Sequence, residues 1–365
     1  MITLGKNDDS SEPAAERADR AALRGMRWRC FCAACVSSLL LGLVLGDSAA
    51  EPVEKEKYAQ AVEAFRRGAD AGEALATSNL GVMYLKGFGV EQDYDRAARL
   101  FETAAAAGLP GAMFNRGMME LRGYGRAVDP GQAAAWFKRA AELDDREAQF
   151  FLAVMCSQGE GIPQDFACAR RWFEASAQAG LAVSQFNLAM LLLRGDGGER
   201  DEISAADWLQ RAKAQDYEPA VHQLASIELS HRDDPERLAR GADMVRGLAE
   251  QGDGEAQLRL GLMYLVGQAV PADLEEGRFW LREAALQQVI EAQISLATSY
   301  AQTEGKARDL VEAYAWLSIA AQRSEIAQKA LKEIGEDLSE AERQQALDQA
   351  RKYADRFKVG AELTE

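Results

Sequence analysis

Histidine is almost absent from this chain. Only His222 and His231 occur among its 365 residues, and their spacing does not fit the zinc-binding pattern H-E-x-x-H. The sequence also has no phosphate-binding P-loop, no G-x-S-x-G and no serine followed three residues later by lysine. These absences argue against a metallohydrolase, a P-loop nucleotidase and the common serine hydrolases. The sequence therefore predicts no enzyme, no catalytic residue, no cofactor and no metal site.

Positive charge is also scarce. The chain has 42 Lys and Arg residues against 58 Asp and Glu residues, which gives a net charge of −16. A nucleic-acid backbone would be repelled by such a surface, because binding to phosphates depends on an excess of cations. Nucleic acid is therefore excluded as the main partner, and a protein or peptide is expected instead.

The first fifty residues differ from the rest. Residues 1–25 are polar and without apolar periodicity, so they are expected to be disordered or to precede the true start, for which Met26 is a candidate. Residues 26–50 hold a basic segment, the apolar run Cys30–Leu45 and then small residues, the order of a secretory signal cleaved after Ala50. This predicts export, to the periplasm or beyond. The run of about 16 residues is shorter than the roughly 20 that a spanning helix needs, and an uncleaved inner-membrane anchor is the alternative.

Beyond this segment, the sequence repeats with a period of 36 residues in seven copies. A small residue recurs first, at Ala76, Ala112, Ala148, Ser184, Ala220, Ala256 and Ala292. An aspartate recurs at Asp93, Asp129, Asp165, Asp201, Asp273 and Asp309, and a tryptophan at Trp136, Trp172, Trp208, Trp280 and Trp316. A fixed period of this length is typical of a solenoid, in which each unit buries its apolar faces against its neighbours.

One unit is predicted to be a helix hairpin. Small and apolar residues at helical spacing form the first helix, and a Gly-x-Gly pair such as Gly87 and Gly89 ends it, because glycine adopts a left-handed conformation without steric cost. The aspartate then caps the second helix. The tryptophan is expected to fill the space between units. Calcium binding by the aspartates and sugar stacking on the tryptophans are the less favoured interpretations.

The predicted fold class is all-α: a right-handed α/α superhelix (solenoid) of about seven 36-residue helix-turn-helix repeats over residues 75–326. Residues 55–74 match the second-helix columns and form a leading half-repeat. Residues 327–358 are expected to form C-terminal capping helices, the last of them opened by a capping box at Ser339 to Glu342. The copy at 219–254 lacks the loop glycines, so its turn is expected to differ.

The segment EAQLRLGLMYLVGQAVPADLEEGRFWLREAA (Glu255–Ala285) resembles the Sel-one-like repeat (SLR) family, which is related to tetratricopeptide repeats. The resemblance extends over about residues 57–325. It implies a curved superhelix that acts as a protein-protein interaction scaffold or adaptor. Bacterial members resemble exported or periplasmic factors in envelope signalling, polysaccharide production and host contact. A β-lactamase-like or glycan-acting hydrolase on the same scaffold is the alternative function.

Some members of that family carry a cysteine pair in every repeat and are linked to β-lactam binding. This chain departs from that pattern, because only Cys156 and Cys168 remain beyond the N-terminal segment. An antiparallel hairpin could bring these two level, so they form a candidate disulfide in an oxidising compartment. Two separate buried thiols are the alternative.

One row of polar residues on the first helices is a candidate partner-binding site. In three copies an asparagine stands directly before the leucine that recurs in the first helix. A cation follows seven residues after each asparagine, on the same face of the helix. The row consists of Asn79, Lys86, Asn115, Arg122, Asn187, Arg194 and Arg259. Such donors suit peptide carbonyls and carboxylates. The alternative is that the cations only favour helix C-termini and the asparagines are structural.

Overall fold

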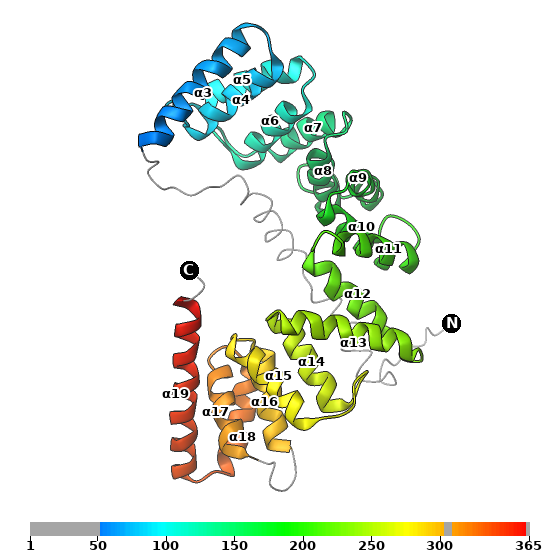
Figure 1. Cartoon of the computed structure of the whole chain (residues 1–365), viewed down its shortest axis with the longest axis vertical. Helices are drawn as coiled ribbons and strands as arrows, with labels where there is room; N and C mark the ends of the chain where they lie inside the picture. Colours follow the sequence, from blue (N-terminus) through cyan, green and yellow to red (C-terminus); the bar gives the residue numbers. More distant parts are fainter. Residues whose placement is uncertain (1–51, 303–308, 363–365) are drawn as a thin grey trace, which may run out of the picture. The chain divides into compact units, whose positions relative to one another are not determined.

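The computed structural model describes residues 52–302 and 309–362, and within these ranges it contains helices and no strand (Figure 1). The helices are α3 (Pro52–Asp70), α4 (Ala74–Lys86), α5 (Tyr94–Ala106), α6 (Pro110–Arg122), α7 (Pro130–Ala141), α8 (Arg146–Gln158), α9 (Phe166–Gln178), α10 (Ala182–Arg194), α11 (Glu202–Lys213), α12 (Glu218–Ser230), α13 (Pro235–Glu250), α14 (Gly254–Val266), α15 (Leu274–Leu286), α16 (Ile290–Gln302), α17 (Leu310–Ala320), α18 (Glu325–Glu336) and α19 (Glu340–Glu362). The predicted secretory signal and the residues before it lie outside the described ranges. None of the described helices is long and apolar enough to cross a bilayer.

The described residues fall into two compact units. The first holds the described residues up to Leu152 together with Glu160–Ile162, and the second holds the others. In the first unit α3 to α7 pack each against the next along the chain. In the second unit α9 to α17 do the same, and α18 and α19 pack on α17 (Figure 1). The predicted all-α repeat solenoid is thereby confirmed.

The helix ends follow the repeated sequence columns. Five of the first helices of the repeats are followed by a glycine with φ between 69° and 76°, and the N–H of each glycine donates to the carbonyl four residues earlier. These glycines are Gly87, Gly123, Gly159, Gly195 and Gly267. The aspartate column caps the second helices as predicted. Asp93, Asp129, Asp165, Asp201, Asp273 and Asp309 each accept a backbone N–H from the first turn. Each of these bonds satisfies a donor that would otherwise have no intrahelical partner.

The second loop glycine has a different purpose from the first. At Gly197, φ is +76°, and a Cβ atom would lie 2.3 Å from the carbonyl oxygen of Phe166, at the start of α9. Gly161 has the same relation to Pro130, with a Cβ position 2.3 Å from the Pro130 carbonyl carbon. This glycine therefore lets the loop of one repeat lie directly on the backbone of the preceding repeat, a role that a helix stop alone does not require.

The most deeply buried column is the one that follows the tryptophans. The residue after each tryptophan position is fully buried: Phe101, Phe137, Phe173, Leu209 and Leu281 have 0% exposure. These side chains meet the small residues of the first helix, and the ring of Phe137 leaves no room for a Cβ at Gly117. Trp172 and Trp316 are buried, whereas Trp136, Trp208 and Trp280 are only partly covered. Trp280, although partly exposed, packs against the apolar core of the preceding repeat, and Trp316 belongs to the core formed with the preceding repeat, as expected of residues that fill the space between repeats.

The divergent copy has a shorter turn, as expected from its missing glycines. Helix α12 ends before His231, which has an ordinary φ of −88°, and α13 begins at Pro235. Its capping residue is Asp234, which accepts the N–H groups of Glu236 and Arg237. The cap has therefore moved three residues upstream of the position that the 36-residue period gives.

The C-terminal helix α19 covers α17 through one aromatic pair and one polar cluster. The rings of Trp316 and Tyr353 stack with centroids 4.4 Å apart. The Tyr353 hydroxyl donates to the Glu312 carboxylate at 3.0 Å, and Gln349 donates to the same group. Burial raises the pKa of Glu312, and burial together with the Glu312 charge raises the pKa of Tyr353 to about 12.

This raised pKa predicts sensitivity to alkali. The unfolded chain releases the Tyr353 proton near pH 10, whereas the folded chain retains it to about pH 12. The contribution of the neutral tyrosine is therefore complete below about pH 10 and is lost as the pH rises towards 12. In Tyr353→Phe, the free energy of unfolding from urea titrations should fall less between pH 9 and 12 than in the parent chain. Tyr124→Phe, at an exposed ring, is the control; parallel curves for Tyr353→Phe and the parent would contradict this assignment.

Candidate functional site

The predicted polar row divides into two groups once its contacts are known. Asn79 and Lys86 lie on α4, and Asn115 and Arg122 lie on α6, all in the first unit. Arg122 is exposed and the other three are partly exposed. Within the described part of the chain, none of these four side chains makes a hydrogen bond or ion pair. These four residues, named the donor row below, keep their hydrogen-bond donors available.

The remaining members, in the second unit, are already engaged. Asn187 donates its amide to the carbonyl of Val183 at 2.7 Å. Arg194 donates to the carbonyl of Met190 at 3.2 Å and pairs with Asp196, also at 3.2 Å, and burial lowers its pKa. Arg259 donates to the Ser226 hydroxyl at 2.8 Å, a contact that joins α14 to α12.

The geometry of the donor row suits an extended chain. Asn115 and Arg122 are two helical turns apart, or about 10 Å along α6 at 1.5 Å per residue. Asn79 and Lys86 repeat this spacing on α4. An extended peptide advances about 3.3 Å per residue, so each pair matches roughly three residues of such a peptide. An amide and a cation at this spacing can bind a peptide carbonyl and a carboxylate together.

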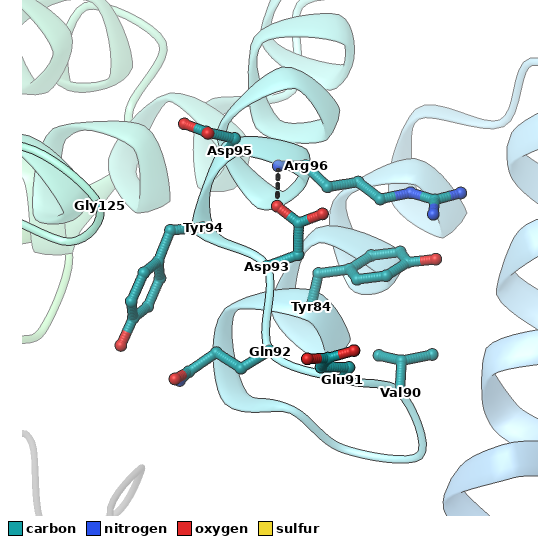
Figure 2. A pocket seen from close by; sticks show the side chains of 9 residues that line it. All are labelled: Tyr84, Val90, Glu91, Gln92, Asp93, Tyr94, Asp95, Arg96 and Gly125. Atoms are coloured by element: carbon teal, nitrogen blue, oxygen red, sulfur yellow. Dashed lines mark hydrogen bonds between the residues drawn. The ribbon is translucent and has the colours of Figure 1, made fainter.

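A cavity of about 660 Å³ opens at the loop between α4 and α5 (Figure 2). Its polar lining consists of Tyr84, Glu91, Gln92, Asp93, Tyr94, Asp95 and Arg96. Some of these lining residues also stabilise the fold: Asp93 caps α5, and the Arg96 guanidinium lies over the Tyr84 ring at 4.4 Å. The cavity offers carboxylates and phenol groups for recognition of a polar ligand.

Two stacked aromatic pairs, at the α4–α5 loop and at the α6–α7 loop, were not anticipated from the sequence. Phe88 stacks on Tyr58 with ring centroids 4.9 Å apart, and Tyr124 stacks on Tyr94 at 5.6 Å. Phe88 and Tyr124 are each 36% exposed. A signal was present, because only in these first two copies is the residue between the loop glycines aromatic. The donor row and the aromatic loop ends thus belong to the same two repeats.

A buried ion pair on α6 was also missed. Arg116 occupies a position that is leucine in the other six of the seven copies, and its side chain is only 4% exposed. Its guanidinium lies 2.6 Å from the Glu120 carboxylate and 2.9 Å from that of Glu102. Arg126 reaches Glu120 from the loop at 3.3 Å. The sequence signal was the acidic residue four positions after the arginine.

The two cysteines of the second unit are bonded in the structure. Cys156 lies on α8 and Cys168 on α9, and their sulfur atoms are 2.09 Å apart. The Cys156 side chain is buried and Cys168 is partly exposed. The bond joins the two helices of one hairpin, as the candidate pairing requires.

The comparisons with known proteins agree with this architecture. A family model described as "Sel1 repeat" matches residues 74–109, 110–145, 146–181, 182–217, 254–289 and 290–324, more than half of the chain. A solved Sel1 repeat protein from Oxalobacter formigenes is 26% identical, with 89% of this chain and 91% of that chain covered and a TM-score of 0.58. The protein c5321, a protective antigen present in uropathogenic Escherichia coli strains displaying an SLR fold, is 25% identical, with 83% of this chain and 73% of that chain covered and a TM-score of 0.50. No protein of curated function matches. The chain belongs to the Sel1 repeat family.

Proposed function

We propose that this protein is an exported interaction scaffold that binds an extended peptide or protein segment through the donor row on α4 and α6. The observation that carries the proposal is the set of four donors in the first unit without a partner in the described chain. The equivalent donors in the second unit are bonded internally. This difference favours recognition as the role of the first two copies.

Charge favours an acidic segment as the ligand. The chain as a whole carries −16, so two cations beside two amides form a local exception on an acidic protein. A carboxylate bound there gains charge-assisted hydrogen bonds, which are about twice as strong as neutral ones. The exposed rings of Phe88 and Tyr124 add apolar contact area near the same repeats.

Export is the second part of the proposal. It rests on the order of basic, apolar and small residues in 26–50, which is that of a cleavable signal. A bond between Cys156 and Cys168 is compatible with an oxidising compartment. The N-terminal residue of the exported protein tests this part, with Glu51 expected.

The binding surface is tested by a double substitution. In Asn115→Ala/Arg122→Ala, capture of envelope proteins by the immobilised chain should fall at least about tenfold, because a hydrogen bond to a charged group contributes about 1.5–3 kcal/mol. The readout is the quantity of each captured protein, with far-UV circular dichroism to confirm that the variant folds.

A matched control lies in the second unit. Asn187→Ala/Arg194→Ala removes the same residue types from the same columns, but there the side chains are bonded internally. Its capture should remain within about twofold of the parent. Equal loss in both variants, or no loss in the first, would contradict the donor row as the binding surface.

A further inference from the structure

One repeat junction has a histidine opposite a carboxylate. His222 on α12 faces Asp253, the residue that caps α14, with 3.4 Å between Nε2 and Oδ1. One period earlier the same two positions hold Phe186 and Tyr217, whose rings are in contact at 5.6 Å. The positions equivalent to His222 in the other copies are Ser78, Phe114, Phe150, Phe186, Leu258 and Ile294. The aromatic contact of the preceding copy is thus replaced here by an imidazole and a carboxylate.

A third ligating group stands beside this pair. Glu218 lies one helical turn before His222, on the same face of α12. One ligand atom from each of Glu218, His222 and Asp253 lies within 4.8 Å of the other two. No other copy has an acidic residue at the position of Glu218, where Ala74, Pro110, Arg146, Ala182, Gly254 and Ile290 stand. The unmatched interval of the family model runs from Glu218 to Asp253, so the three groups lie within and at both ends of the divergent copy.

Helix capping alone does not explain the histidine. Asp145 stands in the same column as Asp253 and likewise accepts an N–H from its helix, that of Ala148 at 2.8 Å. The side chain equivalent to His222 in that copy is Phe114. A capping aspartate is therefore compatible with an apolar residue opposite it, and the imidazole needs another explanation.

The distances fit a divalent transition metal. Two ligands at 2.0–2.1 Å from a tetrahedral ion are about 3.3 Å apart, close to the 3.4 Å between His222 and Asp253. The exposed Glu218 side chain can adjust to complete the set. The Ala256 N–H bonded to Asp253 holds that carboxylate in place, as a supporting contact does in metal sites. Glu218 also lines a surface depression of about 610 Å³, which provides an entry path.

We propose that Glu218, His222 and Asp253 form a zinc-class metal site, with two oxygen donors and one nitrogen donor from the protein. Three protein ligands leave a further position for water or for a group of a partner. The ion links α12 to α14 within the second unit, at the junction where the imidazole faces the carboxylate. This site is separate from the donor row and does not depend on the proposed function.

The experiment is a calorimetric zinc titration of the full chain, with free thiols alkylated under non-reducing conditions. The parent chain should bind one zinc ion. In His222→Phe the affinity for zinc should fall by more than about 100-fold, because residues that only support a metal ligand already contribute 10- to 100-fold to the affinity. Phenylalanine stands at this position in three other copies, so the variant is expected to fold. The melting temperature of the parent, and not that of the variant, should rise on addition of zinc.

Two further variants make the result decisive. His231→Ala removes the other histidine, which pairs with Glu202 at 3.3 Å, and should keep the zinc site. Glu218→Gln changes an exposed residue and should weaken zinc binding at least tenfold without affecting the fold. Absence of zinc binding by the parent at millimolar concentration, or unchanged binding in His222→Phe or Glu218→Gln, would overturn the proposal.

Discussion

Replacing Gly197 by alanine should lower the free energy of unfolding by about 3 kcal/mol. A left-handed conformation costs a residue with a Cβ about 1–2 kcal/mol. The new methyl group would also lie 2.3 Å from the Phe166 carbonyl oxygen and 2.5 Å from its carbon. Backbone atoms cannot move aside as a flexible side chain does, so the loop would be displaced from α9, at a cost of about 1–3 kcal/mol. Urea unfolding followed by far-UV circular dichroism measures the sum.

Gly180→Ala separates the two contributions. Gly180 also has a left-handed conformation, with φ of +91°, but a Cβ there would meet nothing within 4 Å. Its substitution should therefore cost only the conformational part, about 1 kcal/mol. Equal destabilisation by the two substitutions would show that the contact between loop and helix is not required.

Arg116→Leu should destabilise the first unit by about 3 kcal/mol, although leucine is the usual residue at this position. The substitution leaves the Glu120 carboxylate, only 4% exposed, without its nearest cation. Removal of one partner from a buried pair costs about 3–5 kcal/mol. The Arg126 guanidinium at 3.3 Å remains and offsets part of that loss. Urea unfolding again measures the change.

The double variant Arg116→Leu/Glu120→Leu is the control. It reproduces the fourth copy, in which Leu188 and Leu192 stand at these two positions and are buried. A buried pair replaced by apolar residues is often neutral or stabilising, so the double variant should be within about 1 kcal/mol of the parent. If it is as unstable as the single variant, the loss in Arg116→Leu does not come from an isolated charge.

The local features of each repeat could be predicted because they depend on neighbouring residues. The Gly87 conformation and the Asp93 cap follow from steric limits and from one hydrogen bond within a turn. The degree of burial of each tryptophan was not predictable, for the opposite reason. Trp136 and Phe137 are adjacent and both aromatic, and only the packing of the second helix on the first decides which of them is buried.

The candidate site was only partly predictable. The column pattern identified seven polar residues of the same kind, but it could not distinguish Asn115, which has no internal partner, from Asn187, which is bonded to Val183. The pairing of Arg259 with Ser226 joins residues 33 positions apart. Such a contact depends on how one repeat packs on the next, so the sequence of a single repeat does not predict it.

The sequence by itself determined the period, the helix boundaries and the family of this protein, because those depend on side-chain size, backbone sterics and capping within one hairpin. The tertiary structure decided which donors stay available in the first unit and which acids surround His222. It also assigned the second loop glycine to the contact between neighbouring repeats. The physical reason is the same in each case: these properties arise where two repeats meet, and the distances across that junction are set by packing.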